Sequence, residues 1–467
     1  MKFSHPMLWL APALLLAAAL PPQAQAANQA RHAAETAQVL PGQDPLAPVY
    51  IVTSSESFAR GVKTLATKTA VRRNSLGKTL VIASMPTYRL EELSHYMHEE
   101  EGRCGGYFAF GSQVEAETFI RNDKSAQAVS TSFLADYSID KQALVNPWML
   151  QVQETNIRAT ISHLSSYQNR YFASSHGYNA AVWIRDTWLG IAAGRRDVTA
   201  ELFTACTNCS TQPSVILTIR GFEFPDEIVV LGGHLDSIRQ SNPPGTTAEN
   251  MVAPGADDDA SGIATLTEIL RVAMANGYRP KRTIKFMGYA AEEVGLRGSK
   301  AIAQSFQAQG KNVVGVLQLD MTNWKSPSST FDINMISDYS NAPLQQFTRN
   351  LFATYMTPRG FTMNETACGY ACSDHASWTA SGFPAVMYDE GPIFPSLHTT
   401  NDRLENMGGT ANHSVPIAQL GVAFMVELGK VRAADSTVPS LPGRGNTRPA
   451  DPAIPSLPGR GSPKRGN

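Results

Sequence analysis

The chain has 467 residues, of which 43% are hydrophobic and 17% are charged, enough for a large core and for more than one folding unit. This composition excludes disorder as the default state of the chain. The formal net charge is -1 and no long basic run lies within the body of the chain, so a peptide or small-molecule partner is favoured over a nucleic acid.

The first 26 residues have the pattern of a signal peptide. Lys2 precedes an apolar stretch over residues 7–20, and Ala24-Gln25-Ala26 has the small-x-small pattern that signal peptidases cleave. A membrane anchor is the alternative, but three prolines interrupt a stretch that is short for a span of about 20 residues. We therefore expect a secreted protein with no membrane span.

Residues 27–140 have a pattern of their own. Strands are predicted over 49–52, 79–83 and 106–110, with a helix over 90–101, which indicates a small α/β unit. None of the polar clusters described below falls inside it. We therefore predict a propeptide that assists folding and covers the site, and a permanent accessory domain is the alternative.

From Leu144 to about Arg432 strands and helices alternate, which is typical of a mixed or parallel sheet covered by helices. Buried strands are predicted over 227–231, 283–287, 313–319 and 384–387. Apolar residues at three- and four-residue steps predict a helix over 260–276, and Gly277 suits its end. Ligands gather at the carboxyl ends of strands in such sheets.

Polar clusters follow these apolar segments. They are His234-Leu235-Asp236, Asp257-Asp258-Asp259, Glu292-Glu293, Leu319-Asp320 and His398-Thr399-Thr400. A carboxylate or imidazole in a dry strand end is costly unless it is paired or bound to metal, and converging acids repel one another. The mixture of nitrogen and oxygen ligands without a thiolate suits catalytic zinc better than calcium or magnesium. These clusters predict a site for two divalent ions.

Over about residues 146–432 the chain resembles the zinc aminopeptidases of metallopeptidase family M28, above all the secreted bacterial leucyl aminopeptidases. The motifs that carry the resemblance are Gly-Gly-His-Leu-Asp-Ser (232–237), Pro-Gly-Ala-Asp-Asp-Asp-Ala-Ser-Gly (254–262), Ala-Ala-Glu-Glu-Val-Gly-Leu-Arg-Gly-Ser (290–299), Leu-Asp-Met-Thr-Asn (319–323), Cys-Gly-Tyr-Ala-Cys-Ser-Asp-His (368–375) and His-Thr-Thr (398–400). The resemblance implies an α/β fold with a mixed, mostly parallel central sheet flanked by helices.

The resemblance also implies roles for individual residues. Five ligands hold two zinc ions: Asp258 bridges both, His234 and Asp320 complete one, and Glu293 and His398 complete the other. Asp236 orients the His234 imidazole. Glu292, beside a ligand but free of the metal, is the general base that takes a proton from the attacking water and passes it to the leaving amine. Cobalt or manganese could use the same ligands.

An apolar pocket for the first side chain of the substrate is implied near residues 368–372, and its expected lining is Met321, Tyr370, Met387 and Leu397. Such side chains suit a leucine-sized group. The segment 388–396 carries Asp389 and Glu390. If either acid pointed into the pocket, Lys or Arg would be preferred over Leu, so we keep a basic first residue as the alternative.

The five cysteines are Cys104, Cys206, Cys209, Cys368 and Cys372. In an exported protein a disulfide is favoured for Cys368 and Cys372, which leaves Cys104 as the odd cysteine. The state of Cys206 and Cys209 stays open, because a Cys-x-x-Cys pair can also be half of a zinc site, although no second such pair is present to complete it.

The chain is thus predicted to be a secreted, monomeric di-zinc aminopeptidase that acts on the N-termini of peptides or proteins. Its catalytic domain spans residues 141–434, and residues 435–467, in which Pro-Ser-Leu-Pro-Gly-Arg-Gly occurs twice, form a tail for surface attachment or one lost on processing. Glutaminyl cyclase and a non-catalytic binding protein are the rivals, and the complete ligand set with the Glu292-Glu293 pair argues against both. No Gly-x-Ser-x-Gly motif supports a serine hydrolase.

Overall fold

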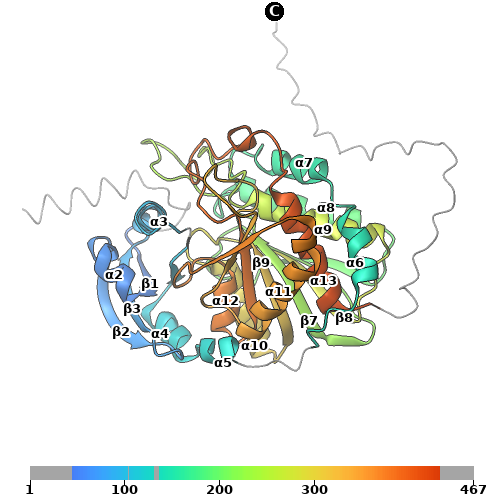
Figure 1. Ribbon diagram of the computed structural model, residues 1–467. Coiled ribbons are helices and arrows are strands. Elements are labelled where there is room, and N and C mark those ends of the chain that lie inside the picture. The colour runs from blue at the N-terminus through green and yellow to red at the C-terminus, as the bar shows by residue number, and fades with distance from the viewer. Residues whose placement is uncertain (1–44, 104, 131–135, 432–467) are drawn as a thin grey trace, which may run out of the picture.

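The computed structural model describes residues 45–103, 105–130 and 136–431, which form two units that lie side by side (Figure 1). The predicted signal peptide and the whole of the predicted tail lie outside the described residues. Among the residues described, no helix has both the length and the apolar character needed to cross a membrane.

The N-terminal unit is built on a four-stranded antiparallel sheet in the order β2-β3-β1-β4. Its elements are β1 (Pro48–Ser54), α2 (Ser55–Arg60), η1 (Val62–Thr64), β2 (Thr67–Arg73), β3 (Thr79–Pro86), η2 (Thr87–Arg89), α3 (Leu90–Glu99), β4 (Tyr107–Phe110), α4 (Gln113–Arg121) and α5 (Ser125–Ser130). The three predicted strands and the predicted helix are all present. Sequence patterning missed β2, because this edge strand is exposed along nearly its whole length and has no apolar alternation.

The C-terminal unit contains an eight-stranded sheet in the order β11-β10-β12-β9-β7-β8-β6-β5. The four central strands are parallel, and antiparallel strands flank them, so the predicted mixed, mostly parallel sheet is confirmed. The strands are β5 (Val198–Phe203), β6 (Ser214–Ile219), β7 (Phe224–His234), β8 (Arg282–Tyr289), β9 (Asn312–Leu319), β10 (Ile333–Ile336), β11 (Met363–Thr366) and β12 (Ala385–Asp389).

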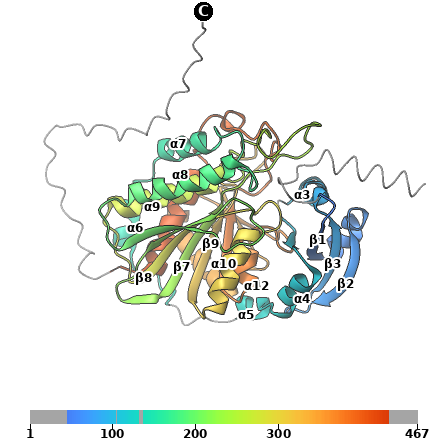
Figure 2. The same cartoon turned by 180° about the vertical axis from the view of Figure 1, so that it is seen from behind.

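Helices cover both faces of this sheet (Figures 1 and 2). They are α6 (Gln142–Met149), α7 (Glu154–Leu164), α8 (Ser175–Ile191), α9 (Ala260–Ala275), α10 (Arg297–Ala308), α11 (Ala342–Tyr355), η3 (Thr357–Arg359), α12 (His375–Ala380), η4 (Leu404–Met407) and α13 (Ser414–Gly429). Along β7, Val229 and Leu231 enter the core beneath α9 and α13, whereas Ile228 and Val230 enter the core beneath α10 and α12. Both faces of the strand are therefore buried, as its continuous apolar sequence predicts.

The parallel arrangement brings the ends of three strands to one edge of the sheet. Strand β7 ends at His234, β8 ends at Tyr289 and β9 ends at Leu319. Helix α9 begins beside this edge, where the side chain of Asp259 accepts a hydrogen bond from the Gly262 amide and caps the helix. The predicted polar clusters therefore meet at the carboxyl edge of the sheet.

Candidate metal centre

The structure brings all five predicted ligands together in two groups that share Asp258. One group is His234, Asp258 and Asp320, the other is Asp258, Glu293 and His398, and within each group the ligand atoms lie within 4.8 Å of one another. Each of the five side chains is at most 4% exposed. Sequence reasoning therefore selected residues that lie side by side despite being up to 164 positions apart.

The carboxylate of Asp258 faces a histidine with each of its oxygens. Oδ1 lies 2.7 Å from Nε2 of His234, and Oδ2 lies 2.9 Å from Nε2 of His398. His234 Nε2 also lies 3.5 Å from Oδ1 of Asp320, and His398 Nε2 lies 2.9 Å from Oε2 of Glu293. A carboxylate placed in this way can bridge two cations, each with one further acid and one imidazole.

The electrostatics of these groups fit bound cations. Burial alone lowers the pKa of His398, but the carboxylates of Glu293 and Asp258 outweigh it and raise the value to about 10. Burial raises the pKa of Glu293 to about 7. Oε1 of Glu293 and Oδ1 of Asp320 have no hydrogen-bond partner among the described residues. Without cations, these buried acids are balanced only by protons on the imidazoles and on the acids themselves. This is the environment expected at a site where metal ions normally supply the positive charge.

Asp236 links His234 to the Glu292-Glu293 pair. Its Oδ1 lies 3.4 Å from Nδ1 of His234 and accepts a hydrogen bond of 3.0 Å from the Glu292 amide. Its Oδ2 accepts a hydrogen bond of 3.3 Å from the Glu293 amide. The carboxylate thus contacts the ring nitrogen that points away from Asp258, which is the contact that orients a ligand imidazole.

Glu292 is 2% exposed, and neither of its carboxylate oxygens has a hydrogen-bond partner among the described residues. Burial raises the pKa of Glu292 well above its ordinary value, and the nearby acids Asp374, Glu293 and Asp320 raise it further while His234 lowers it. A buried carboxyl group with free oxygens and a raised pKa has the properties of a proton acceptor.

The run Asp257-Asp258-Asp259 gives each acid a different environment. Asp259 accepts hydrogen bonds from the amides of His234 and Gly262, at 3.0 and 2.8 Å. Asp257 accepts one of 3.1 Å from the amide of Asn323. The outer two acids therefore fix the loops around the centre, and Asp258 alone points between the two histidines.

Sequence reasoning missed three buried residues that hold the centre in place. Arg170 donates hydrogen bonds to the carbonyl oxygens of Leu235 (3.0 Å) and Pro254 (2.6 Å), on the two loops that carry Asp236 and Asp258. Asp402 accepts a hydrogen bond of 3.2 Å from the Asp258 amide, and Ser373 donates one of 2.6 Å to Asp320 Oδ2. Only Ser373 had a signal, because it lies in the motif at 368–375; the other two are single polar residues far along the chain from their partners.

The four predicted pocket residues fall into three apolar clusters. Met321 and Leu397 pack together with Phe394, whereas Met387 packs with Ile336 and Cys372. Tyr370 belongs to a third cluster that includes Phe108 of the N-terminal unit, with the two ring centroids 5.8 Å apart.

The two acids of segment 388–396 are occupied by other contacts. Asp389 accepts hydrogen bonds from the side chain of Asn334 (2.7 Å) and the amide of Gly391 (2.9 Å). Glu390 is 1% exposed and accepts a hydrogen bond of 2.5 Å from the Trp324 amide. Both carboxylates therefore stabilise loops.

Both close cysteine pairs form disulfides, Cys206–Cys209 and Cys368–Cys372. The second bridge closes the loop that carries Tyr370, as predicted. Cys206 and Cys209, whose state the sequence left open, are therefore joined in a disulfide and are not half of a zinc site.

The N-terminal unit covers the centre. On α3, Ser94 Oγ donates a hydrogen bond of 2.8 Å to the carbonyl of Glu293, and the His98 ring centroid lies 5.0 Å from that of His398. The Gly106 amide donates a hydrogen bond of 2.6 Å to the carbonyl of Ala371 in the disulfide loop. The described N-terminal unit therefore contacts the backbone of one predicted ligand, the ring of another and the loop of the predicted pocket.

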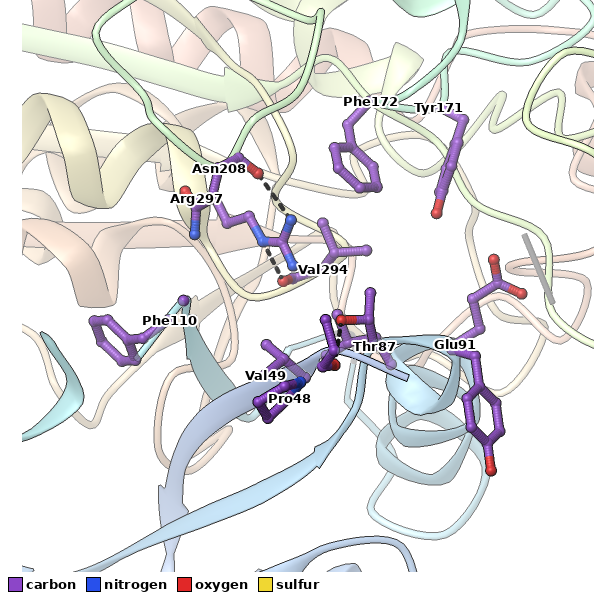
Figure 3. A pocket seen from close by; sticks show the side chains of 14 residues that line it. Pro48, Val49, Thr87, Glu91, Phe110, Tyr171, Phe172, Asn208, Val294 and Arg297 are labelled. Carbon is purple, nitrogen blue, oxygen red and sulfur yellow. Dashed lines mark hydrogen bonds between the residues drawn. The ribbon is translucent and has the colours of Figure 1, made fainter. Parts of the chain in front are cut away.

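A cavity of 280 Å³ remains in the seam between the two units (Figure 3). Pro48, Val49 and Glu91 line it from the N-terminal unit, and Tyr171 and Val294 are among the residues that line it from the C-terminal unit. Val294 directly follows Glu293 in the chain, so the cavity lies close to the centre without containing it.

Comparisons with known proteins agree with this geometry. The model of Peptidase family M28 matches residues 214–430. Leucine aminopeptidase 1 of Arthroderma otae is 36% identical over 307 residues, which cover 63% of this chain and 79% of that protein. The probable aminopeptidase YDR415C of Saccharomyces cerevisiae is 30% identical over 298 residues, covering 62% and 77%.

Two solved structures from Legionella pneumophila resemble the described fold. LapB has a TM-score of 0.67 and is 28% identical, and the likeness covers 82% of this chain and 99% of that one. The LapA aminopeptidase has a TM-score of 0.68 with the same coverage and is 24% identical, which supports the fold alone. Because each likeness covers 82% of this chain, it extends well beyond residues 214–430, which the family model matches.

Proposed function

The chain belongs to peptidase family M28 and is a metal-binding aminopeptidase, and we propose that it is a secreted enzyme that uses two zinc ions to remove large apolar residues such as Leu from peptide N-termini. The observation that carries this proposal is the Asp258 carboxylate, each of whose oxygens faces one histidine. This placement favours one ion held with His234 and Asp320, and a second held with Glu293 and His398. Two imidazole nitrogens in an otherwise carboxylate site favour zinc over calcium or magnesium.

Zinc in such a site polarises the scissile carbonyl and makes water a better nucleophile near neutral pH. The chain's own contribution to the chemistry is the proton transfer. A carboxylate oxygen of Glu292 takes the proton of the attacking water and then passes it to the nitrogen of the leaving amine. Asp236 supports this step, because it bonds the Glu292 amide and so sets where the base lies.

A large apolar first residue fits the surroundings of the centre better than a basic one. Met321, which directly follows the proposed ligand Asp320, packs with Leu397 and Phe394. Asp389 and Glu390 are the acids that would attract Lys or Arg, and both already accept hydrogen bonds, Asp389 from Asn334 of β10 and Glu390 from the Trp324 amide. We therefore propose that Met321, Tyr370, Met387 and Leu397 lie along the path of the substrate side chain, with Leu as the preferred residue.

We also propose that residues 27–140 are a propeptide that inhibits the enzyme until it is removed. A substrate must reach the two ions, yet every proposed ligand is at most 4% exposed while α3 lies over them. Residues 137–141 contact the C-terminal unit, for example through the Asp140 and Lys141 amides, which donate to the Glu427 carboxylate. Cleavage after Asp140 would release the Asp140 contact and leave the Lys141 nitrogen beside the Glu427 carboxylate in the catalytic domain.

We also propose how the chain is processed and that it acts as a monomer. Residues 1–26 direct export and are removed, the catalytic domain spans 141–434, residues 435–467 are a tail, and the enzyme acts as a monomer. These assignments rest on the sequence patterns, and each described unit has an apolar core of its own beside the cluster that the two share.

The decisive experiment compares two peptides of one sequence with leucine first, one with a free amine and one acetylated, using processed enzyme supplied with zinc. Release of leucine from the free peptide alone is expected. Cleavage of both peptides would indicate an endopeptidase, and cleavage of neither would contradict the proposal. Metal analysis of the same sample should give two zinc ions per chain, and Asp258→Asn should lower that number.

A further inference from the structure

Gln240 lies in the loop after β7, six positions beyond His234, and it contacts His398 twice. Its backbone amide donates a hydrogen bond of 3.0 Å to the His398 carbonyl, and its side-chain amide is hydrogen-bonded to Nδ1 of the His398 ring. In the structure Nε2 of this amide faces His398 Nδ1, and its Oε1 is 2.6 Å from Nδ1 of His95 on α3. Gln240 is 7% and His398 is 2% exposed, so the bond between these two side chains is sheltered from water, whereas His95 is exposed.

We propose that Gln240 is a positioning residue that fixes His398 as a metal ligand, and that the N-terminal unit completes its hydrogen bonds through His95 before processing. This inference rests on the role of His398 in the proposed function. Asp236 and Gln240 are then counterparts, because each contacts the Nδ1 atom of one ligand histidine. Neither the sequence motifs nor the ligand geometry identifies Gln240, which lies outside both metal-ligand groups.

The requirements of a metal-bound imidazole set the direction of each hydrogen bond. Nε2 must offer its lone pair to the ion, so Nδ1 must carry the proton and needs an acceptor. The carbonyl oxygen of the Gln240 side chain is that acceptor when the amide turns it toward His398, and the amide nitrogen then donates to Nδ1 of His95. Both partners stay within reach, because the oxygen and nitrogen of an amide exchange places in a half turn.

The two ligand histidines therefore differ in the support that they receive. The Nδ1 atom of His234 faces a carboxylate, and that of His398 faces a neutral amide. Gln240 is also held partly from outside its own unit, since His95 belongs to α3. His95 is exposed, so its bond contributes less than the sheltered bond between Gln240 and His398.

The test is metal binding by the full, unprocessed chain. Gln240→Leu keeps much of the side-chain volume and removes the two side-chain hydrogen bonds, to His398 and to His95. We expect the affinity for one of the two zinc ions to fall about 10- to 100-fold while the other is unchanged, because this is the usual cost of removing the partner of a ligand histidine. Competition with a chelator gives the two affinities, and the absorption spectrum of the cobalt-loaded chain reports on the ligand environment independently of activity.

Two further variants separate this role from general damage to the fold. Asn242→Ala removes hydrogen bonds from the same loop to Glu91 of α3 (3.3 Å) and to the Arg239 carbonyl (2.7 Å) but no bond to His398, and we expect both affinities to stay as in the wild type. Gln240→Glu keeps an acceptor facing His398 Nδ1, and it should bind both ions at least as well as the wild type. A loss in either variant as large as that in Gln240→Leu would overturn the inference.

The result for His398→Ala distinguishes this inference from the proposed function. If His398→Ala loses one ion and Gln240→Leu keeps both at full affinity, the positioning role is wrong and the proposed ligand set stands. If His398→Ala keeps both ions, His398 is not a ligand, and the proposed function fails with it. His95→Ala should lower the affinity less than Gln240→Leu, and a larger loss would also contradict the inference.

Discussion

The two units place their buried polar residues differently. In the N-terminal unit the antiparallel sheet has an apolar core, and polar side chains such as Ser94 and His98 are buried where α3 meets the other unit. In the C-terminal unit, acids and histidines are buried at the carboxyl edge of the parallel strands. Parallel strands collect such groups at one edge, so this unit can carry chemistry, whereas the N-terminal unit provides a cover for it.

The same contrast appears in what each unit needs in order to be stable. The N-terminal unit is held by apolar side chains, in a core of its own and in a cluster that it shares with the C-terminal unit. Several buried acids at one sheet edge repel one another, so the C-terminal unit depends on cations or protons at that edge. Variants that change one unit and leave the other intact are therefore the most informative.

The largest expected effect belongs to the chemical step. Glu292→Gln keeps the shape of the side chain and removes the proton acceptor, so kcat should fall about 10²- to 10⁴-fold. Zinc content should stay at the wild-type value, because Glu292 is not among the grouped ligands. The measurement is leucine release by the processed enzyme with metal analysis of the same sample, and exposed Glu201→Gln on β5 is the control. Normal turnover would remove Glu292 from the mechanism, and lost zinc would make it a ligand.

The second effect tests whether the N-terminal unit only covers the site. Ile51 in β1 and Leu317 in β9 are both fully buried, and replacing either by Ala should cost about 2–5 kcal/mol of unfolding free energy in its own unit. Ile51→Ala should raise the basal activity of the uncleaved chain, because the cover opens more often. Leu317→Ala should lower the stability of the processed enzyme.

Denaturation curves and leucine release on the same samples, with the chain length checked by mass, would follow both changes. If Ile51→Ala left the uncleaved chain as inactive as the wild type, opening of the N-terminal unit would not control access. If it impaired the enzyme after processing, the unit would be needed for more than covering the site.

Patterns that act over short distances in the chain were predicted well. The strands that became β7, β8, β9 and β12 are continuous apolar runs, and each predicted ligand lies in a polar cluster close to such a segment. Because parallel strands align their carboxyl ends, the polar clusters were expected to meet at one edge of the sheet, and the family resemblance supplied the individual ligands.

Contacts between distant loops were not predicted. Arg170 reaches the carbonyl of Leu235, 65 positions away, and Asp402 reaches the amide of Asp258, 144 positions away. No periodicity relates such residues. The predicted pocket is divided among separate clusters for a related reason, because Tyr370 packs against Phe108 of the N-terminal unit, a contact that the sequence of either segment does not indicate.

The third effect is the pH dependence of the seam. Burial lowers the pKa of Lys300, which donates to the Ala109 carbonyl, to about 7, and burial raises the pKa of Glu91 to about 7. In solvent we expect values near about 10.4 and 4.3. From about pH 7 to 10, Lys300 binds fewer protons when the N-terminal unit is in place than when that unit is displaced. The equilibrium therefore shifts toward the covered site as the pH rises through this range. From about pH 4.3 to 7, Glu91 binds more protons when the N-terminal unit is in place than when that unit is displaced. The equilibrium therefore shifts toward the uncovered site as the pH rises through this range.

Covering should therefore be weakest near pH 7, with a change of at most about tenfold per pH unit on either side. The measurement is the activity of the uncleaved chain divided by that of the processed enzyme at each pH, which cancels the enzyme's own pH profile. Lys300→Met should flatten the alkaline side and Glu91→Gln the acidic side. A ratio that is flat from pH 5 to 9 in the wild type would contradict the release of these two groups on opening.

The smallest effect concerns a single helix cap in the N-terminal unit. The side chain of Ser112 accepts a hydrogen bond of 3.2 Å from the Glu115 amide at the start of α4, whose Phe119 packs in the apolar cluster shared with Tyr370. Ser112→Ala should lower the stability of this unit by about 1 kcal/mol, and Ser112→Asp should preserve it. A change of this size raises the open population about fivefold, so basal activity of the uncleaved chain should rise by that factor in Ser112→Ala alone. If Ser112→Asp raised it equally, the effect would come from lost packing at the seam, and the cover would be held by direct contacts more than by the folding of its own unit.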